Sequence, residues 1–339
     1  MTHERPHRRL GSRWLALPFV AAVAVLALPD LFGLDVATPL AQLVSFRPYL
    51  LAGLAALVAV LLVLGRWVRG AVAAACGVAV VLLAAGLMVA PRAVATPVPA
   101  GGRTLSVATF NTYGGEADVA EVAALIRDER PDLVSLVEAG ARYRAELAPL
   151  VEPLGYHLVT AIGEPDGDLG GVTAVVAEHL GDVRARTHVA TPFPRVELEG
   201  GGLGALRFVA FHSIAPRRGD VPQWRSDVGL VAQWCAGARP AIVAGDFNAT
   251  FDHSVFRQAT AGCGDAAAQR GTGLTPTWPA WLPPWLGLQI DHVLATEPIV
   301  AEGFAVREIS GSDHRAVIAR LRIPDDVLAP APAGGSAAR

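Results

Sequence analysis

Polar residues end or interrupt several apolar runs in the second half of the chain, and their types suit chemistry on an anionic group. Asn111 ends the run Val-Ala-Thr-Phe, Glu138 ends Leu-Val-Ser-Leu-Val, and His212 ends Phe-Val-Ala-Phe. The others lie in Gly-Asp-Phe-Asn, Gln-Ile-Asp-His and Gly-Ser-Asp-His, and are Asp246, Asn248, Asp291, His292, Asp313 and His314. Ligand sites in α/β folds gather at strand ends, so these side chains are expected to converge.

Each of these positions has an ordinary structural explanation when it is taken alone. An asparagine after a strand is commonly a turn residue, and a glutamate there can cap the next helix. A single histidine on an apolar strand is usually a core residue with satisfied hydrogen bonds. The order of the whole set, at successive element boundaries, favours one shared site over separate coincidences.

The surrounding pattern predicts the elements that must position this site. Apolar runs bounded by turn residues predict strands at 105–110, 132–138, 172–177, 206–211, 241–244, 289–295 and 316–323. Helices are predicted at 118–130, where apolar residues recur at helical spacing, and at 222–236. Strands and helices alternate irregularly, which indicates an α/β or α+β sandwich rather than a regular barrel.

The first third of the chain is apolar and predicts three membrane-spanning helices, at about 14–34, 47–67 and 71–90. The first stretch could instead be a signal peptide, but two more apolar stretches follow and no clear cleavage site is present. A buried helical bundle is disfavoured because polar faces are missing. Residues 91–103 are expected to form a linker, 104–323 the catalytic domain, and 324–339 a disordered tail.

Arginines on one side of these stretches predict the orientation. They are Arg5, Arg8, Arg9 and Arg13 before the first stretch, and Arg66 and Arg69 between the second and third. By the positive-inside rule, the N-terminus lies in the cytoplasm. Three spans then place the catalytic domain outside the cytoplasm, on a multi-pass protein of the cell membrane.

Cys235 and Cys263 of the second domain bear on which side of the membrane this domain lies. Outside the cytoplasm they could form a disulfide, and two free buried thiols are equally compatible with the sequence.

The polar series resembles the endonuclease/exonuclease/phosphatase superfamily over about residues 104–323, with Gly-Asp-Phe-Asn and Gly-Ser-Asp-His as its most specific motifs. The resemblance implies a four-layered sandwich: two mixed β-sheets face to face, with helices outside. Three spans before such a domain also resemble the membrane-anchored bacterial members associated with glycopeptide resistance.

The resemblance further implies a metal-dependent phosphoric ester hydrolase. Glu138 would be the main metal ligand, with Asn111 beside it and Asp313 as a second acidic position. Hard oxygen ligands suit Mg²⁺, and Mn²⁺ could replace it. The remaining positions would be catalytic: His314, Asp291, Asp246, Asn248 and His212.

The implied catalytic roles differ between these residues. Asp291 would orient His314, which would act on the phosphate as a base or as a cationic stabiliser. Asp246 would position or deprotonate the attacking water, while Asn248 and His212 would donate hydrogen bonds to phosphate oxygens. The sequence leaves the identity of the general base open.

Nearby residues bear on the substrate. Arg217, Arg218 and Arg225 follow His212 and could bind a second phosphate, or be solvated surface arginines. Trp278 begins a stretch with three tryptophans that could contact substrate or membrane, or simply pack. Tyr113 occupies a position where abasic-site endonucleases carry an aspartate, which counts against that activity.

Charge separates the two halves of the chain. Residues 1–99 hold eight arginines and three acidic residues, whereas residues 100–339 hold twenty arginines and 28 acidic residues. The acidic balance of the second domain disfavours a nucleic-acid substrate. A phosphorylated, lipid-linked substrate is therefore favoured. An extracytoplasmic nuclease and an inactive phosphate-binding or partner-binding module remain as alternatives, and the sequence predicts no oligomeric state.

Overall fold

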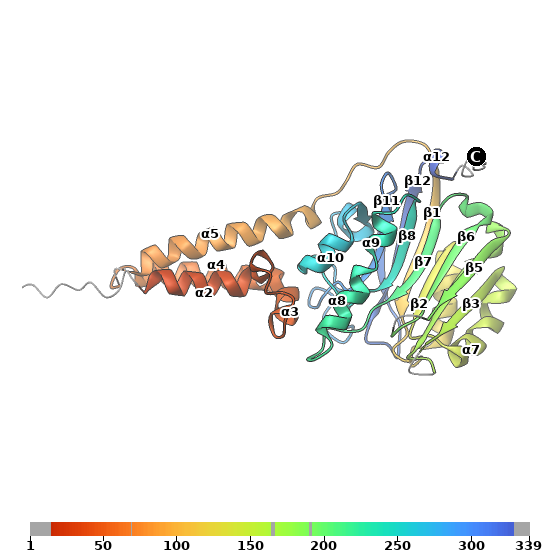
Figure 1. Ribbon diagram of the computed structural model, residues 1–339, viewed down its shortest axis with the longest axis horizontal. Coiled ribbons are helices and arrows are strands. Elements are labelled where there is room, and N and C mark those ends of the chain that lie inside the picture. Colours follow the sequence, from red (N-terminus) through yellow and green to blue (C-terminus); the bar gives the residue numbers. More distant parts are fainter. Residues whose placement is uncertain (1–14, 69, 164–166, 190–191, 329–339) are drawn as a thin grey trace, which may run out of the picture. The chain divides into compact units, whose positions relative to one another are not determined.

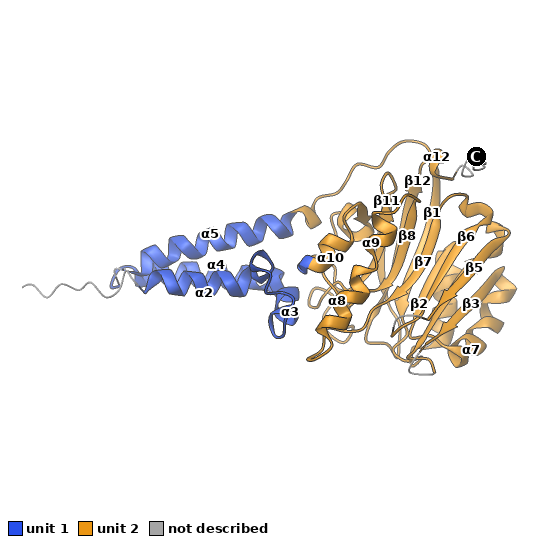
Figure 2. Cartoon of the chain, in the orientation of Figure 1, with its two compact units in different colours: residues 1–90, 252–254 blue, residues 91–251, 255–339 orange. Residues whose placement is uncertain are grey.

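The structure, a computed structural model, describes residues 15–68, 70–163, 167–189 and 192–328. The chain divides into two compact units (Figure 2). One contains residues 1–90 with 252–254, and the other contains residues 91–251 with 255–339. Each unit is described by itself below.

The first unit is built from apolar helices with few polar side chains. Its helices are α2 (Ala16–Ala27), α3 (Leu40–Leu43), α4 (Arg47–Leu64) and α5 (Ala71–Val89), with 3₁₀ turns at Pro29–Phe32 and Val44–Phe46 (Figure 1). α5 packs against both α2 and α4. The contact is made by small and branched residues that include Leu54, Val78 and Ala85. Other large apolar residues face outward, including Leu62, Val80 and Leu83.

The prediction of three membrane-spanning helices is wrong for the first of them. Two of the described helices are long and apolar enough to span a membrane, Leu40–Leu64 and Ala71–Ala93. α2 has 12 residues and is about 18 Å long, against the roughly 30 Å of a bilayer core. Without a third span, the architectural resemblance to the glycopeptide-resistance group loses its basis.

Two residues explain why the first apolar stretch stops being helical. Pro29 cannot donate a backbone hydrogen bond, and its ring clashes with the preceding helical turn. The chain turns there into a 3₁₀ segment that ends at a left-handed Gly33. Asp30 is thereby brought to the buried guanidinium of Arg47, with which it forms an ion pair. Residue 14 and the arginines before it lie outside the described residues.

The second unit consists of two six-stranded mixed sheets with helices on their outer faces, as predicted (Figure 1). The first sheet has the order β11 (Val300–Glu308), β12 (Arg315–Ile323), β1 (Arg103–Asn111), β2 (Leu133–Val137), β4 (Gly171–Ala177), β3 (Tyr156–Ile162). The second has the order β5 (Val183–His188), β6 (Arg195–Gly200), β7 (Arg207–His212), β8 (Ala241–Asp246), β10 (Asp291–Thr296), β9 (Cys263–Asp265).

One pair in each sheet is parallel, and the two pairs have matching positions near the sheet centres. β1 pairs with β2, and β7 pairs with β8, in parallel, whereas the other neighbours are antiparallel. The helices are α6 (Val119–Glu129), α7 (Ala141–Val151), α8 (Val221–Gly229), α9 (Ala232–Cys235), α10 (Ser254–Ala259), α11 (Ala266–Gln269) and α12 (Asp325–Leu328). The predicted helix at 222–236 is therefore two helices, α8 and α9.

Alternation along each strand separates two cores. In β1, Leu105 and Val107 face the interior between the sheets, whereas Ala108 and Phe110 face α6 and α7. Successive side chains of a strand point to opposite faces, so central strands covered on both sides are apolar throughout.

The ends of the second unit differ from the expected linker and tail. Residues 91–103 do not remain free of the domain, because Ala95 pairs with Arg270 in an isolated β-bridge. At the other end, α12 places Val327 in the core between the sheets. The predicted disordered tail therefore begins with an ordered turn, since Val327 has apolar surface to cover, and residues 329–339 lie outside the described part.

A disulfide joins Cys235, at the end of α9, to Cys263, at the start of β9. We expect the double variant Cys235→Ser/Cys263→Ser to lose about 2–4 kcal/mol of unfolding free energy, because the cross-link restricts the unfolded chain. Denaturant unfolding of the full chain with and without a reducing agent measures this. The reducing agent should leave the double variant unchanged, and an unchanged wild-type curve would contradict the cross-link.

Candidate active site

Strand alternation brings the polar strand-end residues to one place. Asn111 shares its face of β1 with Val107, and Asp246 shares its face of β8 with Ala244, both of which belong to the interior core. The same alternation places His212 in β7 and Asp291 in β10 on the interior side. Each polar residue thus continues a row of core side chains at the point where the apolar packing ends.

Asn111 connects the two sheets across this end of the sandwich. Its side-chain amide donates to Glu138 Oε1 at 3.1 Å and to Asp246 Oδ2 at 3.1 Å. Glu138 Oε2 accepts the backbone N–H of Gly114 at 2.7 Å. Two carboxylates from different sheets are therefore held on one amide group.

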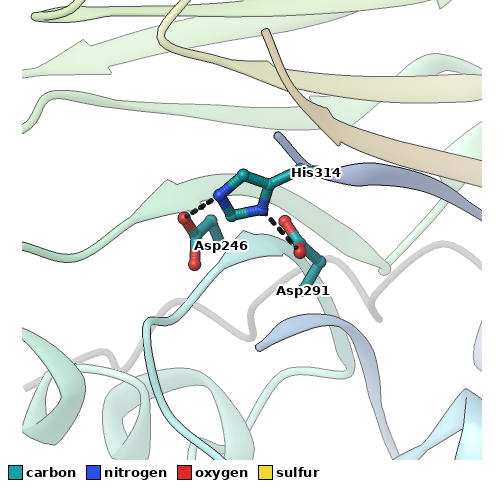
Figure 3. Close-up of side chains that lie close together, drawn as sticks. All are labelled: Asp246, Asp291 and His314. Atoms are coloured by element: carbon teal, nitrogen blue, oxygen red, sulfur yellow. Dashed lines mark hydrogen bonds and ion pairs between the residues drawn. The ribbon is translucent and has the colours of Figure 1, made fainter. Parts of the chain in front are cut away.

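His314 and Asp291 form the second part of the site. His314 Nδ1 lies 2.9 Å from Asp291 Oδ2, and His314 Nε2 lies 3.8 Å from Asp246 Oδ2 (Figure 3). The imidazole is held between the two carboxylates, with Nδ1 bound and Nε2 directed to the side where Asp246 lies. Asp291 is fully buried, so the contact with His314 takes place away from water.

Asn248 and His212 complete the set. Asn248 Nδ2 lies 3.2 Å from Asp246 Oδ2 and 3.0 Å from the carbonyl of Ser213, to which it donates. His212 Nε2 lies 3.8 Å from Glu138 Oε1 and 3.7 Å from Asp246 Oδ2. The structure therefore gathers every predicted metal-binding and catalytic residue into one connected group, completed by Asp313, whose Oδ1 is 3.8 Å from His314 Nε2.

Backbone strain is concentrated at the same residues. Tyr113, Glu138 and Asn248 adopt positive φ angles of 54°, 56° and 47°. Non-glycine residues rarely adopt this left-handed conformation, and its cost, roughly 1–3 kcal/mol, persists where surrounding contacts impose it. Here the hydrogen bonds of Asn111 and Asp246 to the backbone N–H groups two residues later impose it at Tyr113 and Asn248.

Burial shifts the ionisation of the two carboxylates that Asn111 joins. It raises the pKa of Glu138 above its ordinary value, against the opposing hydrogen bonds of Asn111 and Gly114. Burial and the nearby Asp291 raise the pKa of Asp246 to about 7. The positively charged groups of the site therefore do not fully compensate the negative charge of its carboxylates.

The two histidines are shifted in opposite directions. Burial, together with the charge of His314, lowers the pKa of His212 to about 3. Burial also opposes the charged form of His314, but Asp291, Asp246 and Asp313 outweigh it and raise its pKa to about 10. One ring is thus neutral and the other is an imidazolium at neutral pH.

The donor set fits a hard divalent cation. Asp313 Oδ1 and Asp291 Oδ1 are buried and have no hydrogen-bond partner in the described part of the chain. Asp246 is buried and Glu138 is partly buried, and neither carboxylate has a guanidinium or ammonium partner among the described residues. Clustered carboxylate and amide oxygens are the ligands of Mg²⁺, and a cation here would relieve their mutual repulsion.

A second grouping, Asp246, Asp291 and His314, also brings possible ligand atoms within 4.8 Å of one another. Its chemistry suits a metal less well. His314 Nδ1 is already bound to Asp291, and a protonated imidazole repels a cation. We therefore assign these three residues to proton transfer and charge stabilisation beside the metal-binding carboxylates.

Of the four predicted substrate-binding residues, the structure places one at the site. Trp278 belongs to the site, because its Nε1 donates to Asp313 Oδ2 at 2.9 Å. Arg217, Arg218 and Arg225 are exposed on the loop after β7 and on α8. Their guanidinium groups make no hydrogen bond or ion pair within the described residues, so the structure does not join them to the site.

Several positioning residues were missed from the sequence. Thr277 Oγ1 accepts the backbone N–H groups of Ile290 and Asp291, both at 3.1 Å, and so fixes the start of β10. Ser312 Oγ donates to the carbonyl of Asn111 at 2.7 Å. Ser312 lies within Gly-Ser-Asp-His and could have been identified there, whereas Thr277 lies in a loop with no comparable signal.

Phe193 contacts the site through its ring, whereas the ring of His292 does not. Phe193 stacks on His212 with ring centroids 3.9 Å apart, although no motif marks it. His292 points away from the site: its ring nitrogens are 3.0 Å from Asp265 Oδ2 and 3.0 Å from the Ala249 carbonyl. His292 is therefore a core residue with satisfied hydrogen bonds, and only Asp291 of that pair serves the site.

Known proteins share this fold. The sequence model of the Endonuclease/Exonuclease/phosphatase family matches residues 108–314, more than half of the chain. The structure is similar to an endonuclease/exonuclease/phosphatase from Bacteroides vulgatus, with a TM-score of 0.50 and 18% identity, covering 65% of this chain and 99% of that one. No curated protein sequence matches the chain.

Two structures of D. rerio TDP2 are also similar, each with a TM-score of 0.50 and each covering 65% of this chain and 99% of the other. One is a form humanised by 14 mutations, at 17% identity. The other is complexed with a single-strand DNA product, at 16% identity. At these identities the likeness shows the fold that the proteins have in common.

Binding of a divalent cation should stabilise the protein through Glu138. We expect Mg²⁺ to raise the thermal unfolding midpoint of the wild-type chain, with a gain of about 2.7 kcal/mol at one hundred times the dissociation constant. Glu138→Gln should abolish this gain, because a neutral amide replaces the charged ligand. Asp128→Asn, at an exposed carboxylate on α6, is the matched control and should retain it. An equal Mg²⁺ effect in both variants would place the cation elsewhere.

Removing the Asp291 carboxylate should both slow catalysis and change the ionisation of His314. We expect Asp291→Asn to lower kcat about 10²–10⁴-fold. The folded-state pKa of His314, about 10, lies above its ordinary value of 6.5. Stabilisation by this pair is therefore fully present below about pH 6.5 and is lost as the pH rises through about 10.

NMR titration of the His314 ring and unfolding curves at several pH values measure this. In Asp291→Asn the His314 pKa should fall, and the loss of stability between pH 6.5 and 10 should shrink. A His314 titration that is the same in both proteins would show that Asp291 does not control the ring.

Proposed function

Because the chain belongs to the Endonuclease/Exonuclease/phosphatase family, we propose that it is a membrane-anchored, divalent-metal-dependent hydrolase of a phosphoester or pyrophosphate, acting outside the cytoplasm on a lipid-linked substrate. The observation that carries the proposal is the single connected group formed by Asn111, Glu138, Asp246, Asn248, Asp291 and His314.

Glu138, Asn111 and Asp313 would hold the cation, which when bound polarises the phosphoryl oxygens and neutralises developing charge. These three residues border the Asp246–His314 pair, so a phosphoryl group beside the cation also lies beside the imidazole. The amide of Asn248 and the ring of His212 stand next to Asp246, where they can donate to oxygens that gain charge in the transition state.

Proton transfer is assigned to Asp246. A water molecule attacks phosphorus, the new bond forms from the water oxygen, and the ester P–O bond breaks. Asp246 accepts a proton from the attacking water, the leaving oxygen takes a proton from solvent water, and Asp246 afterwards returns its proton to solvent. His314, held by Asp291, keeps its charge and donates from Nε2 to a phosphoryl oxygen. Asp246 therefore acts as the base, and His314 acts as the cationic hydrogen-bond donor.

Membrane anchoring is supported by the first unit. The helices Leu40–Leu64 and Ala71–Ala93 have mean hydropathies of 2.1 and 2.6, and most of their apolar residues are not buried within the protein. In water, this amount of exposed apolar helix surface would be unfavourable, and a hydrocarbon environment removes the penalty.

The side of the membrane follows from two features. Arg66 and Arg69 lie in the short segment between α4 and α5, which the positive-inside rule assigns to the cytoplasm. With two spans, the segments before α4 and after α5 then both lie on the opposite side, so we keep the extracytoplasmic second unit and give up the cytoplasmic N-terminus. The disulfide between Cys235 and Cys263 supports this, because disulfides persist in oxidising compartments.

A lipid-linked substrate is supported by the anchor and by charge. The anchor keeps the second unit at the bilayer surface, where lipid phosphates are concentrated. The second unit has more acidic residues than arginines, and its three candidate phosphate-binding arginines are not joined to the site. A polynucleotide would need a row of cations along its backbone.

Hydrolysis assays on the full chain in lipid nanodiscs test the substrate class. With Mg²⁺ we expect release of phosphate from lipid phosphates or lipid pyrophosphates, at least tenfold faster than cleavage of single- or double-stranded DNA, and no release with excess chelator. Glu138→Ala should abolish the release. Fast DNA cleavage without turnover of lipid phosphates would establish the nuclease alternative, and biological activity that survives Glu138→Ala would establish the non-enzymatic one.

A further inference from the structure

A pocket of about 510 Å³ opens next to the candidate active site, on the side of Asp313. Asp313 lines the pocket and also lies 3.8 Å from His314, so the pocket and the site share a wall. The other residues of its lining include Tyr113, Ala280, Trp281, Ile309 and Ser312. A group attached to a phosphate at the active site could extend into this space.

The pocket combines apolar surface with two carboxylates, those of Glu308 and Asp313. Tyr113 and Trp281 remain 53% and 69% exposed, although large aromatic side chains usually cover themselves. The described lining contains no arginine, lysine or histidine, so it has no cation for a second phosphate.

The serine hydroxyls and Glu308 of the lining are engaged within the protein, whereas Asp313 Oδ1 has no hydrogen-bond partner among the described residues. Ser310 Oγ donates to Glu121, and Ser312 Oγ donates to the Asn111 carbonyl. Glu308 accepts from Arg315 Nε at 3.1 Å. A hydroxyl-rich ligand would find few free partners here, whereas an apolar group needs none.

The loop that carries Trp281 is held by a buried cation. Arg315 follows His314 and is 1% exposed. Its Nη2 donates to the carbonyls of Ala280 and Leu282, at 3.0 and 2.7 Å. Burying a guanidinium costs desolvation free energy unless it is hydrogen-bonded. The two hydrogen bonds of Arg315 therefore hold the backbone on both sides of Trp281 in place.

The opposite side of the pocket is fixed by the active site itself. Asn111 Oδ1 accepts the backbone N–H of Tyr113 at 2.8 Å, and this turn holds Tyr113 at its left-handed φ. The same asparagine binds Glu138 and Asp246. Tyr113 therefore keeps a fixed position relative to the catalytic groups, while its ring stays free to contact a ligand.

We propose, on the basis of the proposed function, that this pocket binds the leaving group of the substrate and selects one that is uncharged and predominantly apolar. Tyr113 and Trp281 are its specificity-determining residues. In chemical terms the preferred substrate is an aliphatic ester of phosphate or pyrophosphate, whose first carbon atoms lie between the two rings while the P–O bond is hydrolysed.

Straight-chain alkyl phosphates and their methyl diesters, from ethyl to octyl, test the proposal on the full chain in nanodiscs with Mg²⁺. Their leaving alcohols have nearly equal acidity, so changes in kcat/KM along the series report binding. We expect kcat/KM to rise roughly two- to fourfold per methylene until the pocket is filled. Trp281→Ala and Tyr113→Ala should flatten this rise, so that the octyl esters lose more kcat/KM than the ethyl esters.

Trp285→Ala is the matched control. Trp285 lies in the same loop, is 73% exposed, and is not part of the lining. Partition of long chains into the nanodisc affects all variants alike, whereas loss of the pocket affects only Trp281→Ala and Tyr113→Ala. A chain-length dependence that is unchanged in both variants would overturn the proposal.

Three other outcomes would also overturn it. The first is a rate that does not depend on chain length in the wild-type protein. The second is an equal loss in Trp281→Ala and Trp285→Ala at every chain length, which would indicate a membrane contact. The third is a nucleoside 5′-monophosphate that surpasses octyl phosphate and loses its advantage in Trp281→Ala, which would indicate a base-stacking site. If no ester is hydrolysed, even the ethyl esters, the proposed function itself fails.

Discussion

The mutual repulsion of clustered carboxylates at one end of the sandwich is the constraint on which the rest of the site depends. Asp246 and Asp291, which are buried, and Glu138 and Asp313, which are partly buried, converge there with the imidazolium of His314. Such a group opposes folding, as the raised pKa values of Glu138 and Asp246 indicate. The apolar interior between the sheets supplies the stabilisation that keeps these groups together, and a divalent cation would offset their charge.

This arrangement also links catalysis to recognition. Asn111 joins Glu138 and Asp246, and the turn that it forms positions Tyr113 on the pocket wall. On the other side, His314 is followed directly by Arg315, which holds the loop of Trp281. The two walls of the pocket are therefore attached to residues of the candidate active site. The strands thereby set the distance between that site and the pocket.

The two units meet different physical requirements. The second unit buries its apolar residues within two cores and keeps charge for one end, as a folded domain in water must. The first unit leaves large apolar residues exposed along two long helices, and this exposure is the basis of the membrane anchoring that we propose. An ion pair between Asp30 and Arg47 lies fully buried in that unit, where neither charge could remain alone.

The sequence by itself was sufficient for the central strands, because β1, β2, β7 and β8 are largely covered on both faces and are mainly apolar. It did not predict β3 (Tyr156–Ile162), β5 (Val183–His188), β6 (Arg195–Gly200), β9 (Cys263–Asp265) or β11 (Val300–Glu308). In β5, β6 and β11, charged or small residues interrupt the apolar pattern, and β9 has only three residues. The apolar content of the first unit was equally plain, but length alone could not show that Pro29 ends its first helix.

The composition of the site was also determined locally, since Asn111, Glu138, Asp246, Asn248, Asp291 and His314 each stand at the end of a recognisable strand or in a recognisable motif. The resemblance assigned a role to Asp291 and none to His292, and the tertiary structure supplies the physical reason, because one position along a strand reverses the face on which a side chain lies. The tertiary structure also decided that Arg217 stays apart, that Trp281 faces a pocket and that Thr277 fixes Asp291. These are contacts between segments far apart in the chain, and no local pattern encodes the distance between them.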